Sequence, residues 1–213
     1  MKIICIARSY RLHAQEMGAA PPEKPIYFLK PSTAWAREGK VIYPPFTKRL
    51  EYETELVFRI GREGSRLTPA EAVSYVDAMT VGIDFTARDL QSFLKAQGLP
   101  WEMAKGFDTS AWWGTWLPIP EGWENVPFRL YRGQTLLQEG YGRELIFSLG
   151  EIIARASQFF RLEPGDVVFT GTPAGVGPAL PNDVLEAFFG EKKVGTVIIQ
   201  RSPHESFTEG TYI

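Results

Sequence analysis

The segment "LEYETELVFRIG", residues 50–61, alternates between two kinds of side chain over most of its length. Successive side chains of a β-strand point to opposite faces, so this period of two predicts a strand that packs one face against a core. The residues expected on the buried face are Tyr52, Leu56, Phe58 and Ile60. The other face carries Glu51, Glu53 and Glu55, and the spacing leaves three like charges side by side on one strand.

The remaining apolar segments are mostly short and typical of strands, with hairpins expected over residues 128–140 and 183–200. Four helices are expected, over residues 9–18, 67–79, 86–100 and 148–160. The last three begin with a Ser or Thr followed three residues later by Glu or Asp, the pattern of a capping box. In the last helix, Ile152, Ile153, Ala156, Phe159 and Phe160 should form the apolar face. These elements predict an α+β fold, a mixed β-sandwich or β-roll with short covering helices, in one domain over residues 1–213.

The charge balance bears on the class of partner. The 23 Lys and Arg residues against 25 Asp and Glu residues give a net charge of -2. This charge supplies no positive field for nucleic acid or an anionic membrane, so a small-molecule partner is favoured. The single cysteine, Cys5, lies in an apolar segment and indicates a reducing compartment. No segment reaches the roughly 20 apolar residues of a transmembrane helix, and we expect a cytoplasmic protein.

Two interpretations of the glutamates remain open from the residues alone. The face could be a solvated polar surface, or Glu53 and Glu55, roughly 7 Å apart at their Cα atoms, could share a divalent cation. Asp84 supports the second, because it interrupts "TVGIDFTA", an otherwise small and apolar strand. Carboxylates without a Cys or His cluster favour a hard cation, Mg²⁺ or Mn²⁺.

Other polar residues also have two interpretations. Lys105 could be a surface lysine or part of a site, and His13 and Glu16 could be an exposed i,i+3 pair or a dyad in which Glu16 orients His13 to take a proton from water. The other histidine, His204, lies in a polar tail and is assigned no role. The glycine-rich segment "TGTPAGVGP" lacks the Gly-Lys-Ser/Thr ending of a P-loop, but its backbone N–H groups suit a carboxylate or enolate oxygen.

Several segments in order resemble the fumarylacetoacetate hydrolase family, in its small single-domain branch related to acylpyruvases. These segments are "ARSYRLHAQEM", "YFLKPSTA", "YETELVFRIG", "GIDFTARDLQ", "KGFDTSAWWG" and "FTGTPAGVG". The family usually has Asn where this chain has Ser9. The resemblance implies the C-terminal domain fold of that family, with residues 8–24 as a mobile lid.

The same resemblance implies a function for each matched residue. Glu53, Glu55 and Asp84 would hold one Mg²⁺ or Mn²⁺ ion, and Lys105 would steady a substrate enolate. His13 and Glu16 would be the lid dyad that activates water. The residues expected to bind the substrate are Arg88, Gln91, Gly171 and Thr172. Glu51 matches no ligand, which leaves it solvated or supporting its neighbours.

The expected reaction is hydrolysis of a C–C bond in a small 2,4-dioxo acid of the acylpyruvate or fumarylpyruvate type. The same site would also serve a 2-hydroxyhepta-2,4-diene-1,7-dioate isomerase or an oxaloacetate decarboxylase or tautomerase. A different alternative is a non-catalytic β-roll binding module whose glutamate face is wet. Trp112, Trp113 and Trp116 could belong to the core or to a subunit interface, and the resemblance favours a homodimer.

Overall fold

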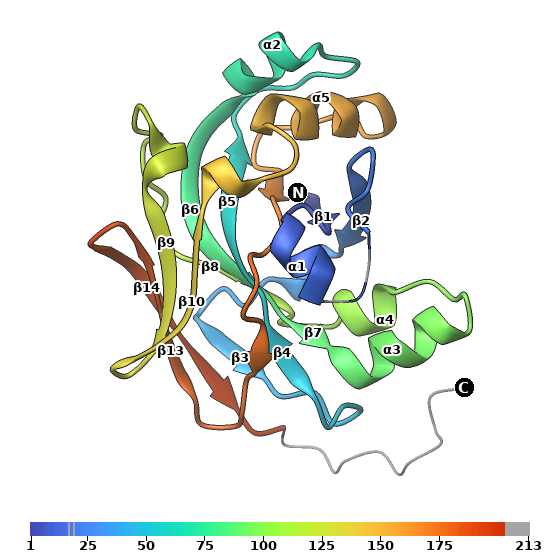
Figure 1. Ribbon diagram of the computed structural model, residues 1–213, viewed down its shortest axis with the longest axis vertical. Coiled ribbons are helices and arrows are strands. Elements are labelled where there is room, and N and C mark those ends of the chain that lie inside the picture. The colour runs from blue at the N-terminus through green and yellow to red at the C-terminus, as the bar shows by residue number, and fades with distance from the viewer. Residues whose placement is uncertain (17, 19, 203–213) are drawn as a thin grey trace.

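The computed structural model is an α+β structure of three β-sheets and several short helices (Figure 1). It describes residues 1–16, 18 and 20–202, so Met17 and Ala19 of the expected lid, and His204, lie outside the described residues. The expected α+β class, with more strands than helices, is confirmed.

The largest sheet has six strands in the order β2-β1-β11-β5-β6-β8. β1 and β11 pair in parallel, and the other neighbours are antiparallel. The strands are β1 (Ile3–Ala7), β2 (Ile26–Lys30), β5 (Thr54–Ile60), β6 (Val76–Asp84), β8 (Ala111–Trp113) and β11 (Val167–Phe169). The glutamate segment therefore enters the middle of a sheet, where side chains on both faces are covered.

A five-stranded sheet has the order β10-β9-β13-β14-β3, and a three-stranded sheet has the order β12-β4-β7. Both expected hairpins are confirmed, as the pairs β9–β10 and β13–β14. The five strands are β3 (Lys40–Ile42), β9 (Pro127–Arg132), β10 (Thr135–Tyr141), β13 (Val184–Phe189) and β14 (Lys192–Gln200). The three short strands are β4 (Leu50–Tyr52), β7 (Thr86–Ala87) and β12 (Gly177–Pro178).

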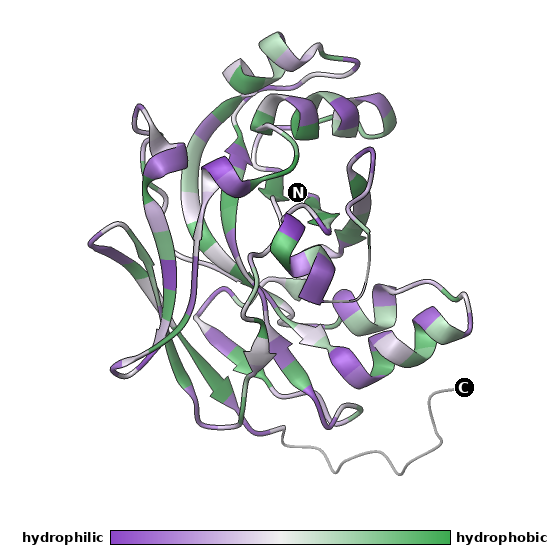
Figure 2. Ribbon diagram, in the orientation of Figure 1, coloured by the Kyte–Doolittle hydropathy of each residue, from purple (hydrophilic) through white to green (hydrophobic). Residues whose placement is uncertain are grey.

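The main core contains residues from both large sheets and from helix α5 (Leu149–Phe159). Tyr52, Leu56, Phe58 and Ile60 all belong to this core, as the alternation predicted. The capping box of α5 is also confirmed, because Ser148 Oγ accepts a hydrogen bond from Glu151 N at 3.2 Å. Figure 2 shows α5 with both hydrophobic and hydrophilic bands, as an amphipathic helix requires. Phe159, expected on the apolar face, is instead 62% exposed.

Two expected helix boundaries are wrong. The helix expected over residues 67–79 stops early: α2 (Pro69–Ala72) keeps the capping box at Thr68, and β6 begins at Val76 after one 3₁₀ turn. Pairing of β6 with β5 outweighs the local helical pattern. Thr86, expected to cap the helix after it, lies in β7, and α3 (Arg88–Ala96) begins without a side-chain cap.

Two further helices lie near the ends of β1 and β2. These are α1 (Arg11–Glu16) and α4 (Glu102–Lys105), and Figure 1 shows α4 packed beside α3 on the same side of the molecule. The 3₁₀ turns are Ser32–Ala34, Val73–Tyr75, Trp123–Asn125 and Gly142–Glu144. Among the described residues, even the longest helix has only 11 residues, and none could cross a bilayer.

The tryptophan cluster is largely part of the protein interior. Trp112 and Trp113 are buried, and the ring of Trp113 stacks on Trp35 with centroids 4.5 Å apart. Trp116 is only partly buried and lies 6.2 Å from the Trp113 ring. The core interpretation is therefore right for the first two residues, and the homodimer stays a prediction that sedimentation would test.

Candidate active site

Three carboxylates meet where β5 and β6 lie side by side. Glu53 precedes β5, Glu55 lies within it, and Asp84 is the last residue of β6. The backbone joins them directly, because Asp84 N donates to Glu53 O at 2.8 Å. One oxygen of each residue lies within 4.8 Å of one from each of the others, and all three residues are buried. The solvated interpretation of the glutamate face is therefore wrong.

The donor set fits a hard divalent cation. Carboxylate oxygens are the ligands that Mg²⁺ and Mn²⁺ prefer, and three of them converge here without a softer ligand. Burial raises the pKa of Glu55 well above its usual range, and the charges of Asp84 and Glu53 raise it further. A cation held by Glu53, Glu55 and Asp84 would remove this repulsion.

Lys105 is buried against the same cluster rather than exposed. Its Nζ donates to Glu53 Oε2 at 2.8 Å, to Asp84 Oδ2 at 2.9 Å and to Thr86 Oγ1 at 2.6 Å. Burial acts to lower the pKa of Lys105, but the charges of Asp84 and Glu53 outweigh it and raise the pKa. The ammonium therefore stays charged, and its three N–H donors are used by oxygen atoms of the chain.

A second buried lysine was missed by the sequence reasoning. Lys30 Nζ lies 2.7 Å from Asp84 Oδ1 and donates to the Ser110 carbonyl at 2.9 Å. Its side chain has no exposed surface. The available signal was a lysine at the end of the apolar strand "IYFLK", because such a strand end buries an ammonium only when oxygen atoms surround it.

Arg88, at the start of α3, ties two of the glutamates together. Its Nε donates to Glu51 Oε2 at 2.6 Å, one terminal nitrogen donates to Glu53, and the other donates to Gln91 Oε1 at 2.6 Å. Burial would raise the pKa of Glu53, but the charges of Lys105 and Arg88 lower it. Glu51 is only 3% exposed, so it is no solvated bystander, and it supports the site by holding Arg88.

His13 and Glu16, the pair expected to activate water, lie in contact on α1. His13 Nδ1 lies 3.2 Å from Glu16 Oε2, and His13 is only 6% exposed, so an exposed pair is the wrong interpretation for the histidine. Glu16 Oε1 also accepts a hydrogen bond from Gly175 N at 3.1 Å. Glu16 thus orients His13 and fastens α1 to the glycine-rich loop.

The glycine-rich loop is bound to the carboxylate strand. Gly171 N donates to Glu55 Oε2 at 2.6 Å. Gly171 has φ +96°, and a Cβ there would overlap Ser9 Oγ, so only glycine fits. Thr172 Oγ1 donates to Thr54 O at 2.9 Å and accepts from Gln138 Nε2 at 3.0 Å. The proton of the Thr172 hydroxyl is therefore already committed to the backbone.

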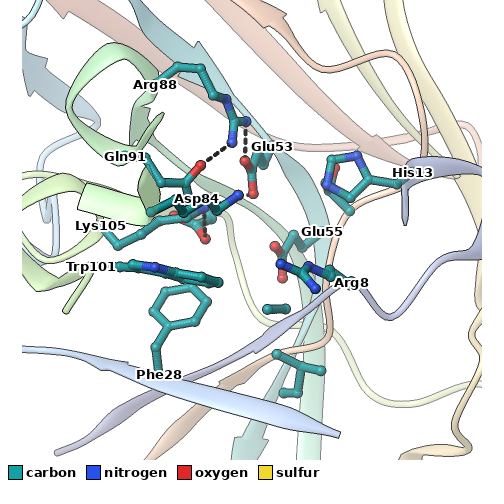
Figure 3. Close-up of a pocket in the computed structure, with 14 residues that line it drawn as sticks. Arg8, His13, Phe28, Glu53, Glu55, Asp84, Arg88, Gln91, Trp101 and Lys105 are labelled. Atoms are coloured by element: carbon teal, nitrogen blue, oxygen red, sulfur yellow. Dashed lines mark hydrogen bonds and ion pairs between the residues drawn. The ribbon is translucent and has the colours of Figure 1, made fainter. Parts of the chain in front are cut away.

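One pocket joins most of these groups (Figure 3). The expected residues that line it are His13, Glu53, Glu55, Asp84, Arg88, Gln91, Lys105 and Thr172. Glu16 and Gly171 are not among its lining residues and instead hold His13 and Glu55 in place. Lining residues that the sequence reasoning did not single out include Arg8, Phe28, Lys95 and Trp101.

Comparison with known proteins identifies relatives over most of the chain. The sequence profile described as fumarylacetoacetate (FAA) hydrolase C-terminal matches residues 2–200. The chain is 41% identical over 189 residues to the mitochondrial oxaloacetate tautomerase FAHD1 of Bos taurus, covering 87% of this chain and 85% of that protein.

Solved structures are similar over almost the whole chain. A fumarylpyruvate hydrolase from Pseudomonas aeruginosa, crystallised with Mn²⁺ and pyruvate, has a TM-score of 0.86 at 34% identity, covering 95% of this chain and 90% of that one. A 2-hydroxyhepta-2,4-diene-1,7-dioate isomerase from Mycobacterium marinum has a TM-score of 0.81 at 28% identity, covering 95% and 75%. With the profile match over residues 2–200, these similarities show that the chain belongs to the fumarylacetoacetate hydrolase family.

Proposed function

We propose that this protein is a divalent-metal-dependent enzyme that hydrolyses a C–C bond in a small 2,4-dioxo acid of the acylpyruvate or fumarylpyruvate type. The observation that carries the proposal is one pocket lined by three buried carboxylates, a buried charged lysine and a histidine oriented by a carboxylate. The three carboxylates, with a bound cation, and the lysine suit stabilisation of an enolate, and the histidine suits activation of water.

Glu53, Glu55 and Asp84 would hold the ion, Mg²⁺ or Mn²⁺. When bound, it supplies a Lewis acid that polarises the carboxylate and keto oxygens of a 2-oxo acid. Lys105 would act on the developing enolate through its charge, because its N–H donors are used by Glu53, Asp84 and Thr86. That charge is maintained because the pKa of Lys105 is raised.

His13 supplies the base. The hydrogen bond from Nδ1 to Glu16 leaves Nε2 as the nitrogen that accepts a proton from water. The resulting hydroxide adds to the acyl carbonyl carbon, the adjacent C–C bond breaks, and its electron pair passes to the pyruvate enolate. Proton return to that enolate gives pyruvate and the second carboxylic acid, so atoms and charges balance.

Substrate placement falls to groups with unused donors. Arg88 has five N–H donors, and three of them are used by Glu51, Gln91 and Glu53. Gln91 accepts from Arg88 through Oε1, which leaves its amide N–H groups for the substrate. The Thr172 hydroxyl already donates its hydrogen bond to Thr54 O. We therefore assign Thr172 a role in shaping the loop rather than in donating a hydrogen bond to the substrate.

Replacement of His13 tests the proposal. His13→Ala should lower kcat for acetylpyruvate or fumarylpyruvate hydrolysis by about 100-fold or more while Mn²⁺ binding, measured by calorimetry, stays at the wild-type value. Glu53→Gln with Glu55→Gln should abolish Mn²⁺ binding. Full hydrolysis by His13→Ala would contradict the role of the dyad, and no Mn²⁺ binding by the wild type would favour the non-catalytic module.

Oxaloacetate tautomerisation is a second candidate, favoured by the 41% identity to the bovine tautomerase. It needs the same enolate but no nucleophilic water. Incubation of the wild type with a panel of oxo acids, followed by product analysis, separates the candidates. Acetate or fumarate with pyruvate indicates hydrolysis, whereas a shifted enol-to-keto ratio of oxaloacetate without C–C cleavage indicates tautomerisation.

A further inference from the structure

Thr86 is buried next to the pocket without lining it. The sequence pattern predicts that its side chain caps the following helix, but α3 begins at Arg88 without a side-chain cap. Thr86 lies instead in β7, where it pairs with Glu51 of β4, and it has no exposed surface. A hydroxyl buried in this way needs hydrogen-bond partners, and its partners show what it does.

The hydroxyl of Thr86 joins two groups of the site. Lys105 Nζ donates to Thr86 Oγ1 at 2.6 Å, and the same oxygen lies 3.1 Å from Glu53 Oε1. An ammonium group can only donate, so Thr86 must accept from Lys105, and its own proton is left for Glu53. The hydroxyl therefore has one orientation that satisfies both neighbours, and it holds the ammonium and this carboxylate against each other.

Thr86 differs from the other two side chains that accept from Lys105 Nζ. These are Glu53 and Asp84, which line the pocket together with Lys105 and belong to the carboxylate cluster (Figure 3). A divalent cation held by the cluster would share these carboxylates and would repel the ammonium. Thr86 is the neutral acceptor of the three and no member of the cluster. Its contact is therefore the one that a bound cation would compete with least.

The backbone of Lys105 is anchored separately from its ammonium. Lys105 N donates to Trp101 O at 3.0 Å, and Lys105 O accepts from Ser110 Oγ at 2.9 Å and from Lys30 Nζ. A lysine carries its charge at the end of a flexible four-carbon stem, so a fixed backbone does not place the ammonium. The place of the ammonium depends on the groups that accept from Nζ.

We propose that Thr86 is a positioning residue that holds the Lys105 ammonium at the carboxylate cluster, where the charge of Lys105 stabilises the developing enolate. The inference rests on the proposed function, because the enolate is that of the 2-oxo acid substrate. Thr86 does not line the pocket, so its effect on the reaction passes through Lys105 and Glu53.

Binding of an enolate analogue tests this role without turnover. Oxalate presents an anionic oxygen where pyruvate presents a neutral keto oxygen, so calorimetry on the Mn²⁺-loaded protein compares these two ligands. The wild type should bind oxalate more tightly. Thr86→Val nearly keeps the shape of the side chain but removes the hydroxyl, and it should reduce the ratio of oxalate to pyruvate affinity about 10-fold. Thr86→Ser keeps the hydroxyl and should restore the ratio to within about 3-fold of the wild-type value.

The matched control is Thr80→Val. Thr80 is also fully buried in a strand, and its hydroxyl donates to the Thr115 carbonyl at 2.9 Å without lining the pocket. The control should lower stability in chemical denaturation about as much as Thr86→Val does and leave the affinity ratio unchanged. An unchanged ratio in Thr86→Val would overturn the proposal. So would a Thr86→Ser variant that resembles Thr86→Val, or an equal loss of the ratio in Thr80→Val.

Turnover separates this outcome from failure of the proposed function. Thr86→Val should lower kcat for acetylpyruvate about 10-fold with KM within about 3-fold of the wild-type value, because the enolate charge develops only in the transition state. Wild-type kcat and KM in Thr86→Val would overturn the positioning role. A wild type whose oxalate preference depends on Thr86 but which hydrolyses no oxo acid would contradict the proposed reaction and leave the role of Thr86 standing.

Discussion

Replacing Glu55 by Gln should stabilise the metal-free protein and abolish its stabilisation by metal. Like charges 4.8 Å apart, the upper limit within this cluster, repel by about 3.5 kcal/mol at an effective dielectric constant of about 20. Glu55 faces two such neighbours, Glu53 and Asp84, so the repulsion acting on it is about 7 kcal/mol. The charge of Lys105 and partial protonation of Glu55 offset much of this repulsion. In the variant, the amide N–H group of Gln at position 55 would be buried without a hydrogen-bond partner, which costs about 1–3 kcal/mol of stability.

The net gain for Glu55→Gln is then about 2 kcal/mol, which raises Tm by about 4–8 °C for a domain of this size. The amide oxygen of Gln can still accept the hydrogen bond from Gly171 N, so the loop keeps its anchor. For the wild type, Mn²⁺ at 100 times its Kd should add about 2.7 kcal/mol, or about 5–11 °C. The variant should show no such rise.

Differential scanning calorimetry with EDTA and with Mn²⁺ measures both effects in one pair of scans. The matched control is Glu63→Gln, because Glu63 is a partly exposed glutamate whose partner, Arg161, is also on the surface. It should change stability by less than about 0.5 kcal/mol and keep the full Mn²⁺ shift. An Mn²⁺ shift of wild-type size in Glu55→Gln, or a metal-free variant less stable than the wild type, would refute the reasoning.

Four further predictions follow from neighbouring contacts. The pKa of Glu55 is raised by burial and by the charges of Asp84 and Glu53, so Mn²⁺ must displace a proton from Glu55 when it binds. Calorimetry in buffers of different ionisation enthalpy should detect this proton release, and the affinity for Mn²⁺ should rise with pH. In the metal-free protein, stability from Glu55 is present below pH 4.5 and lost as pH rises through its folded pKa; a denaturation series in which Glu55→Gln has the wild-type pH dependence would contradict this. Gln138→Met removes the side-chain oxygen that accepts a hydrogen bond from Thr54 N at 2.9 Å, and Thr54 lies between Glu53 and Glu55. This change should weaken Mn²⁺ binding about 10-fold in a titration. An unchanged affinity would exclude a positioning role for Gln138. Ser148→Ala removes the cap of α5 and should cost about 1 kcal/mol in chemical denaturation with Mn²⁺ affinity unchanged.

The parts of the fold that depend on local pattern could be predicted from the sequence. The alternation over residues 50–61 identified the buried face of β5, and the Ser148 box identified the start of α5. The helix boundary near Val76 could not be predicted, because pairing with β5 decides it. The role of Thr86 as a helix cap was also wrong, because contacts distant in sequence decide its position. Its hydroxyl donates a hydrogen bond to Glu53 and accepts one from Lys105.

Burial of the glutamate face shows more clearly what a local sequence pattern cannot predict. A wet face and a buried one have the same alternation, and the groups that decide between them come from elsewhere in the chain. Arg88 is 37 residues from Glu51, and Lys105 is 52 residues from Glu53. Only the ordered set of family segments linked these residues in advance. Lys30 was inside one of those segments, "YFLKPSTA", but its partner Asp84 could not be recognised from spacing.

The ion pairs around the carboxylate cluster are distributed unevenly over its members. In the described part of the chain, four cations pair with Glu51, Glu53 and Asp84, and these cations are Lys30, Arg49, Arg88 and Lys105. No cation of the described residues forms an ion pair with Glu55, and burial together with the charges of Asp84 and Glu53 raises its pKa. A divalent cation bound at the cluster would therefore lower the electrostatic energy of Glu55 more than that of its neighbours. For this reason the replacement of Glu55, rather than of Glu53 or Asp84, separates the effect of the metal ion from the effect of the ion pairs that the chain itself supplies.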